Sequence, residues 1–385
     1  MPLRFRARKT MKSYNYNSLV NLSNSILKHF GVEPFHETIP EIDEVLKGHK
    51  KVVAVLFDGM GQNIVRKHLD EKSFIRTHYL TTINSTLPPT TAAATTAFLT
   101  GKYPIETGWI GWDTYFKDYD RNIILFRSVD YNTGEKLIKD GEQDIADKYY
   151  PTTKLFELIK NANKNAKTFC IQRHPIQKDG PKTLLWQGVR QVTKAMRSCD
   201  EGFAYFYWDS PDGEMHENGI DHWKVKYQVR KAQRFMKKVA KKNPDTLFIL
   251  FADHGHINFK AFDICEHADL YSLIKRPLSM EKRFASIYVK EGKQAEFAKL
   301  FNKYYGNYFE LISKEEALKS KIFGEGEPAP GVIDSFGDFL AVSLKEYGIY
   351  DSVATIHYGK PFKGHHAGGT EEERLIDISV FNSEK

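Results

Sequence analysis

The sequence contains little cysteine and no long apolar run. Among 385 residues there are three cysteines, Cys170, Cys199 and Cys265, and their odd number and wide spacing exclude a disulfide framework and a zinc knuckle. No stretch approaches the roughly 20 apolar residues that a membrane-spanning helix requires. The N-terminus is basic but is not followed by the apolar segment of a secretory signal. These absences predict a soluble protein of the cytoplasm.

The excess of positive over negative charge is also small. Lys and Arg number 56 against 49 Asp and Glu, a formal charge of +7, which is well short of what a nucleic-acid-binding surface alone would need. Such a charge suits a positive site that attracts a small anionic substrate. Apolar residues make up 41% and charged residues 27% of the chain, which is typical of a globular protein with a sizeable core. The length corresponds to two or three domains.

Short unbroken apolar runs predict buried strands. The valine-rich run at residues 52–57 ends in Asp-Gly, as a strand buried on both faces does. Similar runs lie at 166–172, 202–209 and 245–255, and helical patterns lie at 14–31, 152–163, 187–197 and 217–242. This alternation predicts an α/β fold with a largely parallel central sheet and helices on both of its faces.

The pattern changes after about residue 266. A strand–helix–strand order follows, at 284–292, 294–306 and 307–313, and then a segment rich in Gly and Pro. We therefore expect residues 267–353 to form a small α+β insertion or lid, and 1–266 with 354–385 to form the core.

Polar residues gather where the apolar runs end. Asp58 ends the first run, and Asp253 and His254 end the run at 245–255. Asp212 and His216 are four residues apart, so one turn of helix can direct both at one ion, whereas the spacing from Asp209 to His216 is looser. His365 and His366 lie in a glycine-rich loop at 364–369. Parallel strands bring their carboxyl ends to one edge, so we expect these clusters to meet there.

Thr90 and Thr91 follow two prolines and begin a helical pattern. A threonine at a helix start is most often only an N-cap. The alternative is a nucleophile, because the free backbone N–H groups beside it can hold a phosphate oxygen. Threonine is a poor nucleophile at its own pKa, so this alternative requires a metal ion.

Five motifs occur in the order FDGMG, PPTTAAATTAFLTGKYP, WDSPDGEMH, ADHG and HHAGGTEEE. This ordered set resembles the alkaline phosphatase superfamily and, within it, the nucleotide pyrophosphatase/phosphodiesterase branch. The resemblance covers about residues 50–266 and 355–381. It implies a metal-dependent hydrolase that cleaves phosphodiester or pyrophosphate bonds of nucleotide-like substrates through a covalent phosphothreonine-type intermediate.

The resemblance also implies a role for individual residues. Thr91 corresponds to the nucleophile, because it stands nine residues before Thr100-Gly101, which is the family's spacing. One metal ion would be held by Asp58, Thr91, Asp253 and His254. The other would be held by Asp212, His216 and His366. His256 and His365 would contact these ligands without binding a metal ion themselves. Imidazole and carboxylate ligands without thiolate suit two Zn²⁺ ions and also admit Mn²⁺.

Substrate contacts are expected from Ala92, Trp109 and Trp112. Ala92 follows the nucleophile at the free end of the helix, and the two tryptophans could stack on a nucleobase or another flat leaving group. Packing in the core is the alternative interpretation of both tryptophans. One position departs from the diesterase branch, since Ala94 stands where an asparagine is usual. A phosphomonoesterase of the same superfamily, and a metal-binding protein without turnover, therefore stay open as alternatives.

The basic helix expected within 217–242 also has two interpretations. Its apolar stripe suggests a helix packed on the core with its lysines in water; the stripe consists of Trp223, Tyr227, Val229, Ala232, Phe235 and Val239. Binding of a polynucleotide or a membrane is the alternative. We expect a small phosphate ester such as a nucleotide as the partner, and no stable nucleic-acid or membrane partner.

Overall fold

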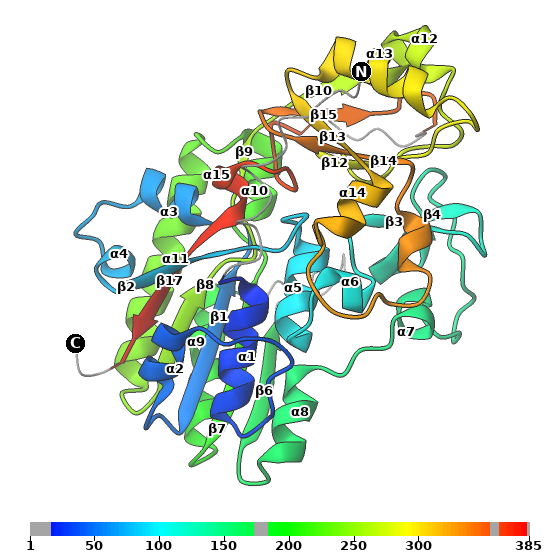
Figure 1. Cartoon of the computed structure of the whole chain (residues 1–385). Helices are drawn as coiled ribbons and strands as arrows, with labels where there is room; N and C mark the ends of the chain where they lie inside the picture. Colours follow the sequence, from blue (N-terminus) through cyan, green and yellow to red (C-terminus); the bar gives the residue numbers. More distant parts are fainter. Residues whose placement is uncertain (1–16, 173–183, 355–361, 383–385) are drawn as a thin grey trace.

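The valine-rich run lies in β1 (Lys51–Phe57), a central strand of a six-stranded sheet in the computed structural model (Figure 1). The structure describes residues 17–172, 184–354 and 362–382. The strand order of this first sheet is β2-β17-β8-β1-β7-β6. The other strands are β2 (Tyr79–Asn84), β6 (Lys167–Gln172), β7 (Gly202–Trp208), β8 (Leu247–Phe251) and β17 (Leu375–Phe381).

The first sheet is largely parallel. β1 pairs in parallel with β7 and β8, and β6 pairs in parallel with β7. β17, at the C-terminal end of the chain, is antiparallel to both β8 and β2. The strands β1, β7 and β8 are buried almost throughout, which is why their sequences are continuously apolar rather than alternating.

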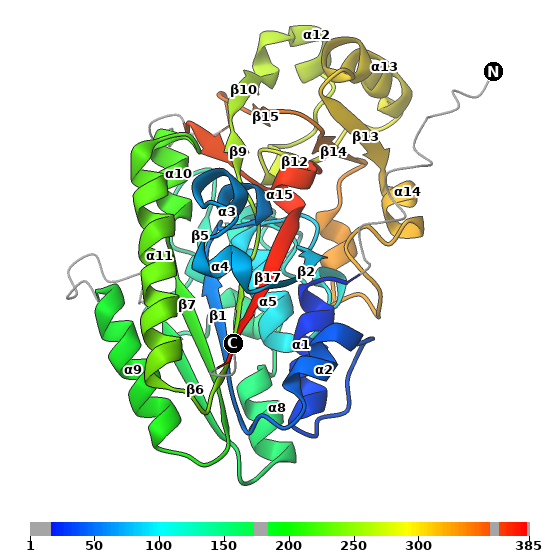
Figure 2. The ribbon, with the colours of Figure 1, turned by 90° about the vertical axis from the view of Figure 1, so that its left-hand side faces the viewer.

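Helices cover both faces of this sheet, as Figure 2 shows. One face carries α3 (Gln62–His68), α4 (Phe74–Thr77), α9 (Leu185–Arg197) and α11 (Trp223–Lys242). The other carries α1 (Leu19–His29), α2 (Pro40–Leu46), α5 (Thr91–Thr100) and α8 (Leu155–Ala162). The predicted α/β class is therefore confirmed. Residues 14–16 of the helix expected at 14–31 lie outside the described residues.

A second sheet of seven strands is antiparallel and lies beside the first (Figure 1). Its order is β13-β14-β12-β11-β3-β4-β5. Its strands are β3 (Asp113–Phe116), β4 (Arg121–Ile124), β5 (Val129–Asp130), β11 (Ser279–Glu281), β12 (Phe284–Ile287), β13 (Phe309–Ser313) and β14 (Phe339–Ser343). The strand–helix–strand pattern expected after residue 284 corresponds to β12, α13 (Gln294–Tyr305) and β13.

The second sheet does not follow the expected boundary at residue 267. β3 pairs with β11 through Asp113 and Met280, so the segment 113–130 joins the same sheet as 279–343. We had assigned 113–130 to the core with the rest of 1–266. The segment that follows α5 and α6 is thus part of the second sheet.

The remaining elements are short connections. They are α6 (Pro104–Thr107), α7 (Ile145–Tyr149), α10 (Asp212–Asn218), α12 (Ala268–Tyr271), α14 (Lys314–Lys319), α15 (Glu371–Arg374), β9 (Ile257–Asn258), β10 (Lys260–Asp263), β15 (Tyr347–Tyr350), β16 (Gly364–His365) and the 3-10 helices η2 (Leu125–Arg127), η3 (Ile264–Glu266) and η4 (Val332–Ser335). In the described part of the chain, no helix has the length and apolar character needed to cross a membrane.

The buried face of α11 differs from the expected apolar stripe at two residues. Its buried residues include Val225, Val229 and Val239, which recur at helical spacing toward the sheet. Trp223 and Tyr227 fall outside this phase and are 67% and 46% exposed, so their assignment to the buried stripe was wrong.

Candidate active site

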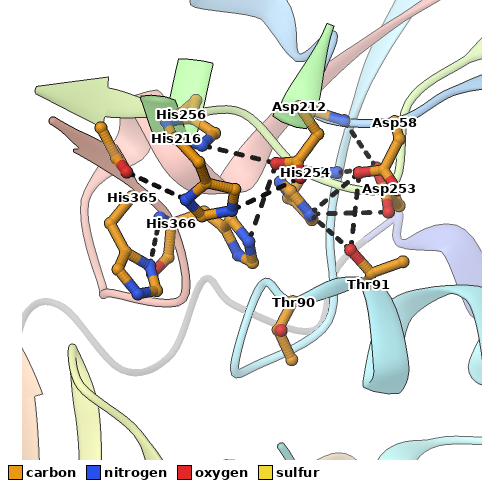
Figure 3. A network of polar contacts seen from close by, with 12 residues as sticks. Asp58, Thr90, Thr91, Asp212, His216, Asp253, His254, His256, His365 and His366 are labelled. Carbon is orange, nitrogen blue, oxygen red and sulfur yellow. Dashed lines mark hydrogen bonds and ion pairs between the residues drawn. The ribbon is translucent and has the colours of Figure 1, made fainter. Parts of the chain in front are cut away.

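The structure brings all seven expected metal ligands together at the carboxyl end of the first sheet (Figure 3). Asp58 directly follows β1, Asp212 begins α10 after β7, and Asp253 and His254 follow β8. His366 follows β16, in the loop before the last strand. Parallel topology is the reason for this convergence, since it places the ends of β1, β7 and β8 on one rim.

One group of ligand atoms surrounds the Thr91 hydroxyl. Asp58, Asp253 and His254 offer atoms that lie within 4.8 Å of one another. Thr91 Oγ1 lies 3.5 Å from Asp58 Oδ1 and 3.2 Å from His254 Nε2. The backbone N–H groups of Gly59 and His254 each donate to Asp253 Oδ1 at 3.0 Å, which fixes that carboxylate.

A second group centres on Asp212. This carboxylate forms one set with His254 and His366 and another with His216 and His256, each within 4.8 Å. His256, which we expect to support the ligands, belongs to the second of these sets, with Nε2 3.4 Å from Asp212 Oδ1. His254 and His256 are separated by one residue, and both side chains are fully buried at the site.

Two other residues stand outside these groups. His365 is buried beside the ligands, with Nδ1 2.9 Å from the backbone carbonyl oxygen of His366, and it joins none of the ligand groups formed by the described residues. That position suits the expected supporting role. Asp209, the alternative to Asp212, also joins none of them.

Backbone carbonyls orient the three expected histidine ligands. The Nδ1 atoms of His216, His254 and His366 lie 3.0, 2.9 and 3.0 Å from the carbonyl oxygens of Gly364, Gly255 and Pro89. A ring whose Nδ1–H donates to a carbonyl presents the lone pair of Nε2 to the site. Each histidine is thus held in the tautomer that a metal ion requires.

The carboxylates at the site have strongly perturbed pKa values. Burial raises the pKa of Asp58, and the charges of Asp253 and Asp212 raise it further. Burial likewise raises the pKa of Asp253 to about 7. Burial would also raise the pKa of Asp212, but the neighbouring His216 and His256 lower it below the usual range. Burial holds the pKa of His366 well below its usual value, so this ring is neutral at pH 7.

These residues fit divalent cations. Asp212 Oδ1, Asp253 Oδ2 and His256 Nε2 are buried and have no hydrogen-bond partner among the described residues. Buried polar atoms without a partner are rare in folded proteins and call for a ligand, a water or an ion. Oxygen and imidazole nitrogen atoms around a cluster of carboxylates are the donors that Zn²⁺ and Mn²⁺ accept.

Thr91 is the first residue of α5, and Thr90 is its N-cap. The first bond within the helix runs from the Ala94 N–H to the Thr90 carbonyl at 2.9 Å. The N–H groups of Thr91 and Ala92 therefore precede the helical ladder and point from its free end. They are available to a phosphate oxygen beside the Thr91 hydroxyl, which is consistent with the expected role of Ala92.

Ala94, which stands where the resemblance implies an asparagine, lies in the first turn of α5. Its side chain is fully buried in the core cluster around the first sheet.

Glu281 is a neighbour of Thr90 that the sequence did not reveal. Its Oε1 accepts hydrogen bonds from Thr90 Oγ1 at 2.6 Å and from the Trp112 N–H at 3.0 Å. Burial raises its pKa to about 7. Glu281 ends β11, a strand of three residues, which is too short to show a periodic pattern. It links the second sheet to both the nucleophile helix and the segment of Trp112.

The two tryptophans differ in their surroundings. Trp109 packs, partly buried, against the core of the second sheet, as the alternative interpretation proposed. Trp112 is partly exposed, its ring meets the edge of Phe126 at a centroid distance of 4.7 Å, and the Arg127 guanidinium lies 5.6 Å from its centroid. Both tryptophans are half-buried, and Trp112 is the one joined to Glu281 by a hydrogen bond from its backbone N–H.

A buried ion pair holds the loop of His366 against the second sheet. Arg283 and Glu373 are fully buried and joined by two hydrogen bonds of 2.7 and 2.8 Å. Glu373 also accepts the Gly368 N–H at 2.8 Å and the Thr370 hydroxyl at 2.6 Å. The pair therefore fixes both ends of the turn that follows His366.

We expect Arg283→Met to lower the free energy of unfolding by about 3–5 kcal/mol, because it leaves the buried Glu373 carboxylate without its cation. Urea denaturation followed by circular dichroism measures this loss. The exposed pair of Lys136 and Asp140 provides the control, and Lys136→Met should leave the midpoint unchanged. An Arg283→Met protein as stable as this control would contradict the assignment.

The comparisons with known proteins agree with this geometry. The fold is that of the alkaline phosphatase superfamily. The pattern of the family described as type I phosphodiesterase/nucleotide pyrophosphatase matches residues 52–354, so the chain belongs to that family. No curated protein sequence is significantly similar to the chain.

Similar solved structures show the same fold. Murine ectonucleotide pyrophosphatase/phosphodiesterase 5 has a TM-score of 0.62 and 16% identity, over 86% of this chain and 88% of that one. An inactive variant of the murine protein, in complex with AMP, has a TM-score of 0.63 and 15% identity over 87% and 88%. Phosphonoacetate hydrolase from Sinorhizobium meliloti 1021, in complex with phosphonoformate, has a TM-score of 0.59 and 14% identity over 86% and 90%.

Proposed function

We propose that this protein is a two-metal hydrolase that cleaves phosphodiester or pyrophosphate bonds in nucleotide-like substrates, with Thr91 as the nucleophile. The observation that carries the proposal is the position of the Thr91 hydroxyl, 3.2 Å from His254 Nε2 and at the free N-terminal end of α5. The AMP complex of the similar murine protein supports a nucleotide-like substrate.

The proposed reaction has two displacements at phosphorus. Thr91 Oγ1 attacks the phosphorus atom while the bond to the leaving oxygen breaks, which yields a phosphothreonine. A water molecule then attacks the same phosphorus, the bond to Thr91 Oγ1 breaks, and the phosphate product leaves. The configuration at phosphorus is retained, because each displacement inverts it. The N–H groups of Thr91 and Ala92 hold a non-bridging oxygen throughout.

Two ions would be held by residues of the groups described above, in the two sets that the family resemblance implies. Asp58, Asp253 and His254 with Thr91 form one set, and Asp212, His216 and His366 the other. When bound, divalent ions lower the pKa of a hydroxyl or a water and stabilise the leaving oxygen. Three imidazoles and three carboxylates without a thiolate favour Zn²⁺, with Mn²⁺ as the substitute. The cytoplasmic location stays a prediction.

Metal analysis paired with two chromogenic substrates tests this function. We expect bis-p-nitrophenyl phosphate to exceed p-nitrophenyl phosphate in kcat/KM by at least about tenfold, a difference of about 1.4 kcal/mol. Faster hydrolysis of the monoester would replace the diesterase assignment with a monoesterase. A metal-loaded protein that hydrolyses neither substrate would support a binding protein without turnover.

Trp112→Ala should reduce kcat/KM for a dinucleotide by about five- to 100-fold, the range expected for loss of one base-stacking contact. Cleavage of an aliphatic phosphodiester provides the internal control and should change little. Equal losses on both substrates would show that Trp112 supports the local structure through its contacts with Phe126 and Arg127 and does not stack on the leaving group.

A further inference from the structure

The outer surfaces of α9 and α11 form a continuous basic face. The two helices pack side by side on one face of the first sheet (Figure 2). Together they carry twelve Lys and Arg side chains and no Asp or Glu. We refer to the outward side chains of residues 185–197 and 223–242 as the α9–α11 face.

The twelve cations of this face account for the whole net positive charge of the protein. The whole chain has 56 Lys and Arg against 49 Asp and Glu. Without the twelve cations of α9 and α11, the counts become 44 against 49, so the rest of the chain is formally negative by five charges. A small net charge thus conceals a strong separation of charge, and such a separation creates a local positive potential.

These cations also lack the ion pairs that occur elsewhere on the surface. Lys28 and Lys51, for example, each lie 2.6 Å from an aspartate oxygen. Among the described residues, the α9–α11 face has a carboxylate within 4.0 Å of only one of its cations, Lys224, which lies 3.5 Å from Glu214. Like charges gathered without counter-charges repel one another, and an anionic partner would relieve that repulsion.

Exposed aromatic rings stand at the start of both helices. Trp186 on α9 and Trp223 and Tyr227 on α11 are 48%, 67% and 46% exposed. Leu184, directly before α9, is also exposed. The Arg190 guanidinium lies 4.7 Å from the ring centroid of Trp186, and the Lys231 ammonium lies 4.9 Å from that of Tyr227. Trp and Tyr beside Lys and Arg are typical of the interface between a membrane and water.

We propose that the α9–α11 face docks on an anionic lipid surface. The sequence of α11 alone favours a solvated helix. The structure adds α9, which extends the carboxylate-free area over a second helix and brings Trp186 and Leu184 to it. Lys outnumbers Arg by eight to four on this face, and lysine is depleted at protein–protein interfaces. An exposed leucine contributes to insertion among lipids, whereas it cannot stack on a base as an aromatic ring does.

The inference is independent of the proposed reaction. It rests on charge and exposure at a surface that contains none of the candidate ligands, and binding can be measured without substrate. Clusters of four to eight basic residues suffice to hold a protein on anionic lipids, with about a fivefold gain in affinity for each Lys or Arg near the surface. The α9–α11 face exceeds that number of cations.

Vesicle co-sedimentation of the full chain tests the proposal. We expect binding to vesicles of equal parts phosphatidylcholine and phosphatidylglycerol, no binding to phosphatidylcholine alone, and a weaker interaction at high salt. The quadruple variant K226Q/R230Q/R234Q/K238Q removes four exposed cations of α11 and should bind the anionic vesicles at least about 100-fold more weakly. Hydrolysis of a soluble substrate should not change in this variant.

A matched variant, with its substitutions between residues 290 and 319, controls for net charge. K290Q/K299Q/K303Q/K319Q removes the same charge from exposed positions and should retain binding. W186A/W223A should weaken binding while the salt dependence remains. Equal losses in the two quadruple variants, or equal binding to neutral vesicles, would overturn the proposal. Tighter binding of a single-stranded oligonucleotide or a short duplex at the same salt would also overturn it and identify a nucleic-acid partner.

Discussion

Thr91→Ala is expected to lower kcat by at least about 10⁴-fold, the order of effect seen when an enzyme loses a covalent nucleophile. The helix end, the carboxylates and the histidines stay in place, so the variant should keep its metal ions. The hydroxyl is the only polar group removed, and a water molecule in its position would not be covalently held at the phosphorus atom. Steady-state hydrolysis of bis-p-nitrophenyl phosphate and elemental analysis of the same sample measure both quantities.

Thr96→Ala provides the control on the same helix. Thr96 lies more than one turn further along α5 and touches none of the candidate ligands among the described contacts. The kcat of the Thr96→Ala variant should stay close to that of the unmodified protein. Acid quenching during turnover adds a direct test, because the unmodified protein should retain labelled phosphate on Thr91 and the Thr91→Ala variant none. Turnover of Thr91→Ala within tenfold of the original would refute the nucleophile.

The convergence of the ligands could be predicted because the rules of parallel sheets are strong. The buried runs that became β1, β7 and β8 were recognisable from their continuous apolar character, and Asp58, Asp212 and Asp253 each follow one of them. The carboxyl ends of parallel strands must share an edge. The three aspartates could therefore be predicted to lie close together, although they are far apart in the sequence.

The second sheet could not be predicted in the same way. Its strands β3, β4 and β5 have four residues or fewer, and pairing between β3 and β11 joins positions far apart in the chain. Short antiparallel strands leave too little alternation to define a face. For the same reason, Glu281 and Arg283 appeared as ordinary charged residues, although one contacts Thr90 and the other stabilises the loop of His366 through Glu373.

The inward position of His256 and the outward position of Trp223 illustrate a further limit. Both depend on the direction of a side chain and not on the location of its backbone. Resemblance to a family identified the ordered motifs, but it could not determine the direction in which each histidine side chain points. The structure resolves this through the contacts of each ring, such as the 3.4 Å between His256 Nε2 and Asp212 Oδ1.

Removal of divalent ions with a chelator is expected to abolish hydrolysis, and readdition of Zn²⁺ or Mn²⁺ should restore it. Three carboxylates in one small volume then lose the positive charge that balances them. Burial raises the pKa of Asp58 and Asp253, to about 7 for Asp253, so in the metal-free protein protons compete with cations for these carboxyls near neutral pH. If a chelated sample, freed of the chelator, retained full activity, the two-metal assignment would fail.

The raised pKa values also predict how metal affinity depends on pH. A cation must displace the protons of Asp58 and Asp253, whereas burial keeps His366 neutral and leaves no proton there to displace. Affinity should therefore fall as the pH drops below about 7, by about tenfold per pH unit for each proton released. Calorimetric titration with Zn²⁺ in buffers of different ionisation enthalpy counts these protons.

The same titration of the Thr91→Ala variant distinguishes protons released by the carboxyls from a proton released by Thr91. It retains Asp58 and Asp253, so it should release the protons of the carboxyls alone. The unmodified protein should release one proton more if the Thr91 hydroxyl ionises when the ions bind, because a threonine hydroxyl otherwise keeps its proton at neutral pH. Equal counts in the two proteins would show that Thr91 stays protonated until substrate arrives. A pH-independent affinity in both would contradict the protonated carboxyls of the metal-free site.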